Sequence, residues 1–203
     1  MAAALAILVS TAFPAIAQLA ESSPAMFSDL AREGWRAERT RNMFVRSLTA
    51  RAGSLDDGDA VRAGLRTALQ YEKLRIATRE LLPRALHGAD VDTTAREIGY
   101  LAEASLEVAL AEARHYAEAR FGPPKNVDGG PSTFVVIGMG KLGGRELNAG
   151  SDVDLIYFYD TDEGGTAPSD GTEHLAPRLL VACRTALDGE SRRADGRRRR
   201  VAR

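Results

Sequence analysis

The sequence has a single cysteine, few aromatic residues and no long apolar run. The one cysteine, Cys183, excludes an internal disulfide framework and is typical of a protein from a reducing compartment. No segment reaches the roughly 18 uninterrupted apolar residues that cross a bilayer, so we expect no membrane partner. What remains is an ordinary globular composition, 44% hydrophobic and 27% charged over 203 residues, which predicts one good domain or two small ones.

The N-terminal residues 1–20 are apolar and rich in alanine, and two interpretations of them are open. Residues 15–18, Ala-Ile-Ala-Gln, resemble a signal-peptidase site, but no Lys or Arg precedes the apolar run as it does in a secretory signal. The favoured alternative is a core helix that is broken at Pro14.

Residues 23–120 carry the pattern of a helical region. Ser23 and Pro24 have the order of an N-cap followed by proline at the first helical position. Pro83 is expected to end a second helix. The apolar positions that follow helical spacing, and that we expect to form the core, are Phe27, Leu30, Trp35, Met43, Phe44, Leu48, Val61, Leu65, Leu69, Leu74, Ala77 and Leu81.

A further helix is predicted between Thr94 and Gly122. Thr94 and Glu97 have the spacing of a capping box, and Gly122-Pro123-Pro124 provides a clear stop. Its expected buried face consists of Ile98, Leu101, Ala102, Ser105, Ala109 and Tyr116. We therefore divide the chain into a helical region at 1–121, a linker of turn residues at 122–132, a small unit with strands at 133–196 and a basic tail at 197–203.

The small unit begins with short β-branched runs. Residues 133–137 and 154–159 are predicted strands, both expected to be central in a small sheet. Residues 162–172 are a predicted loop, and residues 173–188 have the pattern of one more helix. The fold class is therefore α+β, a helical region followed by a small sheet with flanking helices.

Two carboxylates open the second strand. Asp152 and Asp154 are separated by one residue, and because side chains alternate along a strand, both are expected on one face, with Val153 on the other. Two neighbouring carboxylates repel each other, so keeping both ionised calls for a counter-charge. Hard oxygen ligands in this arrangement suit Mg²⁺.

A glycine-rich segment precedes the carboxylates. Glycines directly after a strand allow backbone N–H groups to approach a phosphate closely. The glycines are Gly138, Gly140, Gly143 and Gly144, and the available side-chain donors are Lys141, Arg145 and the hydroxyl of Ser151. A strand, a glycine turn, a short helix and an Asp-x-Asp strand together predict a nucleoside triphosphate site.

Two other interpretations compete. The glycines could simply make a tight turn, with the aspartates as caps. Alternatively, Gly138-x-Gly140-x-x-Gly143 satisfies the dinucleotide-binding fingerprint, with Asp160 as the ribose-binding acid of an oxidoreductase. The second alternative is disfavoured because only about eight residues are available for the crossover helix, whereas a parallel crossover takes about a dozen.

Residues 134–160 resemble the nucleotidyltransferase superfamily, with Gly138 in its glycine turn and residues 151–155, Ser-Asp-Val-Asp-Leu, as its carboxylate strand. More narrowly, residues 138–148, Gly-Met-Gly-Lys-Leu-Gly-Gly-Arg-Glu-Leu-Asn, are similar to the glutamine synthetase adenylyltransferase family. Residues 74–81 and 100–107 also look like the segment that precedes this motif in the family. The resemblance covers most of residues 1 to about 165.

The resemblance implies that residues 133–196 are a partial nucleotidyltransferase domain with an incomplete mixed sheet. It implies that Asp152 and Asp154 are catalytic and bind Mg²⁺, and that Ser151 and the glycine turn bind the phosphates of ATP or ADP. Members move AMP to and from a tyrosine of glutamine synthetase, and the resemblance implies a nitrogen-signalling regulatory protein as a partner. The chain looks more like the N-terminal, AMP-removing half. Because ATP is cytosolic, we expect a cytoplasmic protein.

The C-terminus departs from the family. Members supply a third carboxylate from a later strand, whereas residues 197–203 here are Arg-Arg-Arg-Arg-Val-Ala-Arg. We therefore expect a fragment, or a tail out of its usual frame, that lacks catalytic competence and acts at most as a binding module. Asp160, Asp162 and Asp195 are poor substitutes because none lies in a matching strand. Nucleic-acid binding by the arginines is disfavoured because no aromatic residues are interleaved.

Overall fold

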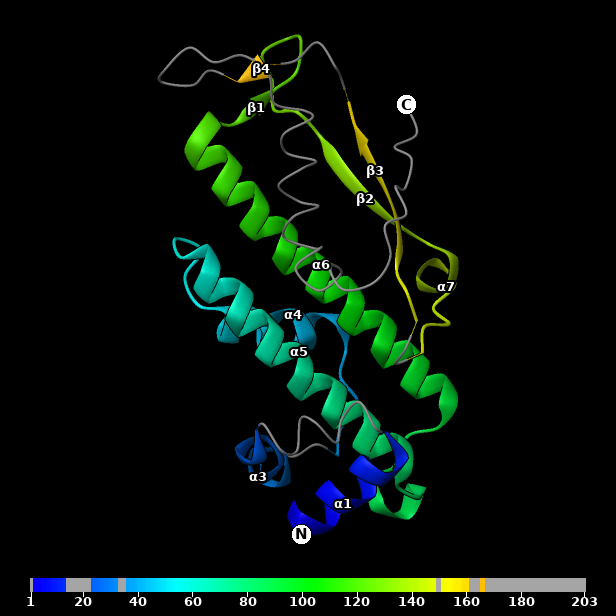
Figure 1. The fold of residues 1–203 in the computed structure, drawn as a ribbon. Coiled ribbons are helices and arrows are strands. Elements are labelled where there is room, and N and C mark those ends of the chain that lie inside the picture. Colours follow the sequence, from blue (N-terminus) through cyan, green and yellow to red (C-terminus); the bar gives the residue numbers. More distant parts are fainter. Residues whose placement is uncertain (1, 14–22, 33–35, 149–150, 161–164, 167–203) are drawn as a thin grey trace, which may run out of the picture.

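The fold is that of a computed structural model, which describes residues 2–13, 23–32, 36–148, 151–160 and 165–166 (Figure 1). A helical part leads into two small antiparallel sheets, which confirms the α+β class. The elements are α1 (Ala2–Ala12), α3 (Pro24–Arg32), α4 (Arg41–Ala52), α5 (Gly58–Leu81), η1 (Arg84–Leu86), α6 (Val91–Phe121), β1 (Pro124–Lys125), β2 (Phe134–Met139), α7 (Gly140–Gly143), β3 (Asp154–Tyr159) and β4 (Gly165–Thr166).

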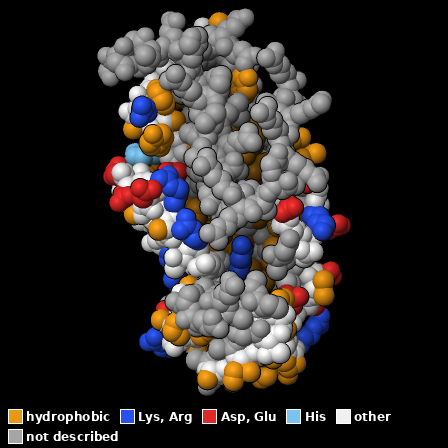
Figure 2. All heavy atoms as spheres, viewed as in Figure 1, with side chains coloured by type: hydrophobic (Ala, Val, Ile, Leu, Met, Phe, Trp, Pro, Cys, Tyr) orange, Lys and Arg blue, Asp and Glu red, His pale blue; other side chains and the backbone are white. Residues whose placement is uncertain are grey.

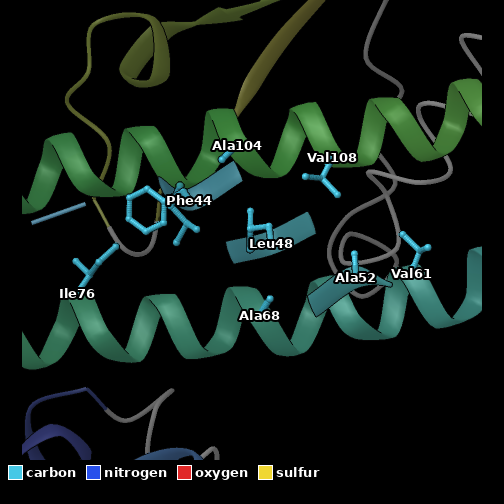
Figure 3. Packing of buried hydrophobic residues seen from close by; sticks show 9 residues of the cluster. Phe44, Leu48, Ala52, Val61, Ala68, Ile76, Ala104 and Val108 are labelled. Carbon is cyan, nitrogen blue, oxygen red and sulfur yellow. The ribbon is translucent and has the colours of Figure 1, made fainter. Parts of the chain in front are cut away.

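The main core lies between α4, α5 and α6. Phe44 and Leu48 of α4 are fully buried, and Figure 3 shows them between the ribbons of α5 and α6. Small residues such as Ala68 and Ala104 face them, which lets the three helices approach closely. Burial of each large apolar side chain stabilises the fold by about 1.5–3 kcal/mol. This bundle is the scaffold beside which the sheet stands.

The helices α1 and α3 pack against α5 and form a second core cluster. Val9 and Leu30 are fully buried there, next to Phe27 and Leu74. The expected N-terminal helix is therefore present in α1. Its other face exposes Ile7, and hydrophobic side chains gather at the same end of the molecule in Figure 2. In the described part of the chain, no helix is both long enough and apolar enough to span a bilayer.

The helix ends follow the sequence except at α6. As expected, α3 begins at Pro24 and α5 ends before Pro83. The capping box predicted at Thr94 was wrong, because α6 begins earlier, with Asp90 as its N-cap. The Asp90 carboxylate accepts a hydrogen bond from the Thr93 N–H at 2.9 Å and so satisfies an otherwise unpaired donor of the first turn.

The buried face of α6 also differs from the prediction. Leu101 and Ala109 are buried as expected, but Tyr116 is 54% exposed, and Ala104 and Val108 lie in the core instead. Met43 of α4, likewise predicted in the core, is 44% exposed. An apolar residue at the margin of a helical stripe faces the core only where a neighbouring helix covers it, and that depends on packing.

A network of charges, most of them buried, joins α5 and α6 to the segment before α4. Arg75 is fully buried and donates to two fully buried carboxylates, through Nε to Glu72 Oε2 at 2.9 Å and through Nη2 to Glu97 Oε1 at 2.5 Å. Arg39 pairs with Glu72, and Arg79 pairs with Glu97. The sequence pattern does not predict this network. Charged side chains are rarely buried unless they are paired, and the pairs here form between residues far apart in the sequence.

The sheet that carries the expected motif is a two-stranded hairpin. Strands β2 and β3 are antiparallel, from the pair Phe134↔Tyr159 to the pair Met139↔Asp154. The strands were predicted as central in a mixed sheet, but every described strand has one antiparallel partner. Within the predicted linker lies β1, which pairs with β4 inside the predicted loop. Trp35, the helix predicted at 173–188 and the basic tail lie outside the described residues.

The hairpin runs beside α6 (Figure 1). At one end, Phe134 of β2 and Phe121 of α6 both pack against the buried Ala117 of α6. At the other end, Arg145 beyond α7 lies over the ring of Tyr100 of α6. The motif is therefore anchored to the helical scaffold at both ends of the hairpin.

Candidate functional site

Three glycines shape the turn between β2 and β3. A Cβ atom on Gly138 would lie 2.7 Å from the Leu142 side chain, which is buried against it. A Cβ on Gly143 would lie 2.7 Å from the carbonyl oxygen of Gly138. Real Cβ atoms essentially never approach this closely, so a side chain at Gly143 would push the Gly138 backbone, and one at Gly138 would displace the buried Leu142 side chain. The two glycines thus make the close turn between β2 and α7, and phosphate binding by this segment stays a prediction.

Gly140 has a different role, because it faces a carboxylate. Its φ of +54° lies in the left-handed region that glycine adopts readily. A Cβ there would be 3.4 Å from Asp154 Oδ2. The antiparallel register explains this proximity, since Met139, directly before Gly140, is paired with Asp154. The structure thus brings the glycine turn and one of the two predicted metal ligands together.

Asp152 and Ser151 lie in the segment that leads into β3. Both Asp152 and Asp154 are exposed, and Val153 between them is half-buried. The Ser151 hydroxyl donates to Asn148 Oδ1 at 2.7 Å and accepts from the Asn148 N–H at 3.2 Å. Ser151 therefore closes a turn that presents Asp152. Asn148 was not predicted as a site residue, although a polar residue three positions before Ser151 is a common turn signal.

The predicted side-chain donors differ in their surroundings. Lys141 is exposed on α7. Arg145 adopts φ +58°, unusual for a residue with a side chain, and its guanidinium carbon lies 5.9 Å from the centre of the Tyr100 ring. The Gly144 N–H donates to the Gly140 carbonyl at 3.0 Å, so this amide is engaged within the turn.

The dinucleotide interpretation is wrong. A Rossmann unit needs parallel strands joined by a long crossover helix, whereas β2 and β3 are antiparallel and α7 spans only Gly140–Gly143. Asp160 does not have the role of a ribose-binding acid either, because it bonds within the hairpin. Its carboxylate accepts hydrogen bonds from the Ser132 hydroxyl at 2.5 Å and from the Thr133 N–H at 3.0 Å, and these close the open end of the hairpin.

The donor set for a cation is small. Over the residues that the structure describes, no group of three or more His, Cys, Asp or Glu side chains could hold a metal ion. Asp152 and Asp154 are thus two oxygen donors at an exposed edge. Such a pair fits Mg²⁺, which is commonly held by one or two carboxylates together with water and substrate phosphates, and does not fit a metal that needs a closed protein cage.

Comparison with known proteins bears on what this site serves. A model of the family described as glutamate-ammonia ligase adenylyltransferase matches residues 4–186. The chain is similar to proteins named bifunctional glutamine synthetase adenylyltransferase/adenylyl-removing enzyme. One from Thioalkalivibrio sulfidiphilus is 35% identical over 175 residues, covering 81% of this chain and 17% of the relative. One from Nitrosococcus oceani is 37% identical over 160 residues, covering 77% and 15%.

A third relative, from Aromatoleum aromaticum, is 34% identical over 177 residues, covering 75% of this chain and 19% of its own length. The chain thus spans less than one fifth of the length of each of these three relatives. The matched region contains all of the described helices except the first residues of α1, together with the glycine turn and both aspartates. The chain therefore belongs to the glutamate-ammonia ligase adenylyltransferase family.

Proposed function

We propose that the β2–α7–β3 hairpin binds a nucleotide, and that the chain serves the transfer of AMP between ATP or ADP and a tyrosine of glutamine synthetase. The observation that carries the proposal is the approach of Asp154 Oδ2 to the bare backbone of Gly140. It places an exposed carboxylate beside a residue, Gly140, that has no side chain to block a phosphate. The names of the relatives support the choice of glutamine synthetase as the protein substrate.

In this proposal the residues of the hairpin divide the work. Asp152 and Asp154 hold Mg²⁺, which when bound would offset the negative charge of the phosphates. Lys141 and Arg145 add positive charge, and the bare backbone of Gly140, which faces Asp154, leaves room for a phosphate oxygen. The hydroxyl of Ser151, directly before Asp152, donates to Asn148, and it would exchange this bond for one to a phosphate when a nucleotide binds. Binding and orientation are the main needs of nucleotidyl transfer.

We assign the chain to the AMP-removing direction, which the resemblance to the N-terminal half of the family favours. In that reaction an oxygen of inorganic phosphate attacks the phosphorus of the adenylylated tyrosine. The bond from that phosphorus to the tyrosine oxygen breaks, and the products are ADP and a free tyrosine hydroxyl. A nitrogen-signalling protein is the regulatory partner we propose, and the cytoplasm, where the nucleotides are, is the proposed location.

A second candidate function is nucleotide or glutamine synthetase binding without turnover. It asks of the two exposed aspartates and the glycine turn only that they bind a nucleotide, with no reaction to follow. A complete in-line transfer needs the attacking and leaving oxygens both to be stabilised, for which a pair of carboxylates is a minimal provision. The two candidates share the same nucleotide site and differ in turnover alone.

The test is calorimetric titration of the full chain with ATP and with ADP, with and without Mg²⁺. The double variant Asp152→Asn, Asp154→Asn removes the proposed ligands. The matched control, Asp92→Asn with Asp128→Asn, removes two exposed carboxylates from α6 and from the loop after β1. We expect Mg²⁺-dependent binding that persists in the control and falls at least about tenfold in the site variant, since second-sphere changes alone cost metal sites 10–100-fold.

The outcomes separate the candidates. Binding that is equal in the site variant and the wild type, or that ignores Mg²⁺, would sink the proposed site. If binding follows the expectation, the release of ADP from adenylylated glutamine synthetase with inorganic phosphate decides between turnover and binding alone. Circular dichroism of each variant confirms that the α4–α5–α6 bundle is intact.

A further inference from the structure

The contact between Arg145 and Tyr100 links the glycine turn to the helical scaffold. Arg145 follows α7 in a left-handed conformation, between the buried side chains of Leu142 and Leu147. Its guanidinium carbon lies 5.9 Å from the centre of the Tyr100 ring, at the outer limit of the range in which a cation is attracted to an aromatic face. A left-handed non-glycine residue persists only where its surroundings hold it, and here the ring is one such restraint.

The Tyr100 end of this contact is firmly placed. Tyr100 is half-buried on α6 and packs against the core cluster of Phe44 and Leu101. It lies three residues after Glu97, whose fully buried carboxylate accepts from Arg75 and Arg79 of α5. Three residues along a helix is close to one turn, so Tyr100 stands beside the most tightly bonded part of α6.

The Arg145 end controls the turn. The N–H of Arg145 donates to the Leu142 carbonyl at 3.1 Å, and the next N–H, of Glu146, donates to the Lys141 carbonyl at 2.9 Å. These bonds close α7, which begins at Gly140, the residue that faces Asp154. Displacing Arg145 would therefore loosen the backbone that the proposed phosphate site consists of.

We propose that Tyr100 is a positioning residue that holds Arg145, and through it the glycine turn, ready for a nucleotide phosphate. The inference rests on the proposed nucleotide site and adds a residue outside the motif. A guanidinium uses its face on an aromatic ring, while its N–H groups point outward in its plane and remain available to phosphate oxygens. Arg145 can thus keep its contact with Tyr100 while it binds the ligand.

The first measurement needs no nucleotide. Hydrogen exchange of the peptide that spans residues 140–148 is compared in the full-length wild type, Tyr100→Leu and Tyr100→Phe. A cation–π contact at an exposed site corresponds to about a two- to fivefold change in a local opening equilibrium, so Tyr100→Leu should exchange about that much faster. Tyr100→Phe keeps the aromatic ring and should exchange as slowly as the wild type. Fast exchange in Tyr100→Phe would instead mean that the hydroxyl makes the contact.

The control for helix stability is Tyr116→Leu, the same substitution on the same helix at a residue that is 54% exposed. It should leave exchange of 140–148 unchanged. Peptides from the buried parts of α5 serve as an internal reference, because general destabilisation by Tyr100→Leu would raise their exchange as well. Faster exchange confined to 140–148 marks the proposed link.

The second measurement is the affinity for Mg²⁺–ATP by calorimetry. Tyr100→Leu should weaken binding about two- to fivefold and Tyr100→Phe should recover it. Unchanged exchange of 140–148 in Tyr100→Leu overturns the positioning role, and a wild type that still binds Mg²⁺–ATP then leaves the proposed function standing. If the wild type binds no nucleotide, the proposed function fails, and faster exchange alone reduces the Tyr100–Arg145 contact to a structural one.

Discussion

The helical bundle and the hairpin both carry acidic side chains, but they use them in opposite ways. In the bundle, Glu72 and Glu97 have no exposed surface, and Arg75 lies between them with every nitrogen of its guanidinium engaged. In the hairpin, Asp152 and Asp154 are exposed at the edge of a glycine turn.

Burial accounts for the difference. A carboxylate that leaves water loses several kcal/mol of hydration, so it persists in its charged form only with built-in partners. The arginines of the bundle therefore stabilise a fixed structure and are not available to a ligand. The exposed aspartates retain hydration and can exchange water for a cation. Charged residues of the same kinds thus hold the scaffold together in one region and form the candidate site in the other.

The largest expected effect is at Glu97. Replacing Glu97 with glutamine removes the charge that faces Arg75 and Arg79. Arg75 keeps Glu72, but the Arg79 guanidinium is left buried without its counter-charge. Breaking a buried ion pair from one side typically costs about 3–5 kcal/mol, so the free energy of unfolding in urea should fall by that amount.

The matched control is Glu107→Gln. Glu107 lies on the same helix and pairs with Arg41, but both side chains are more than 40% exposed. Exposed pairs contribute about 0–1 kcal/mol, so this variant should stay within that range. Equal losses in the two variants would show that burial does not distinguish the charges of the bundle from those on the surface.

The sequence predicted the hairpin better than the bundle. The order strand, glycine turn, short helix and strand was confirmed, because the glycines and the β-branched runs determine the local backbone. The short connection explains the antiparallel register, because it cannot reach a parallel neighbour. That Asp152 and Asp154 bind Mg²⁺, and that the turn binds phosphate, stay predictions.

The buried network could not have been predicted. Arg75, Arg79 and Glu97 have the appearance of a solvated helix face in the sequence, and they are buried only because α4, α5 and α6 meet there. The same holds for Tyr100, which receives Arg145 from a distant segment of the chain. Contacts of this kind depend on the packing of whole helices, whereas turn chemistry depends on a few neighbouring residues.

The second effect in size is expected at Gly143. A methyl group there would lie 2.7 Å from the Gly138 carbonyl oxygen, which is backbone and cannot move aside alone. Forcing an extra carbon into a packed site costs about 1–3 kcal/mol, so Gly143→Ala should distort α7 and weaken Mg²⁺–ATP binding correspondingly. Gly144→Ala is the control, since its Cβ would lie 3.5 Å from the nearest atom. Urea unfolding should find the stability of Gly144→Ala close to wild type and that of Gly143→Ala lower; similar losses in both would argue against close packing at Gly143.

A smaller effect is expected in the pH dependence of stability. Burial raises the pKa of Glu112 above its ordinary value of 4.5, with a further rise from Asp59, while Arg62 and His115 act in the opposite direction. A carboxyl whose pKa is raised on folding binds its proton more tightly when folded. The stability that it contributes is therefore present at low pH and is lost as pH rises through the raised pKa.

The measurement is the free energy of unfolding of wild type and Glu112→Gln at pH 4 and at pH 7. The glutamine side chain does not titrate, so the wild type should lose stability relative to the variant as pH rises. Asp56 is expected to behave in the opposite way. Hydrogen bonds from Ser54 and His115 lower its pKa below 3.8, so its contribution to the free energy of unfolding is lost as pH falls through that lowered pKa. The opposite trend at Glu112 would mean that the attraction of Arg62 outweighs the burial.

The smallest effect on stability is expected at the two aspartates of the proposed site. Asp152→Asn with Asp154→Asn changes two surface side chains at nearly constant volume, so the free energy of unfolding should stay within about 0.5 kcal/mol of wild type. The same variant is expected to lose Mg²⁺-dependent nucleotide binding. A marked fall in stability would place the aspartates with Glu97 as structural residues. Unchanged stability with lost binding is the combination that a ligand site requires, because a group that holds a ligand need not hold the fold.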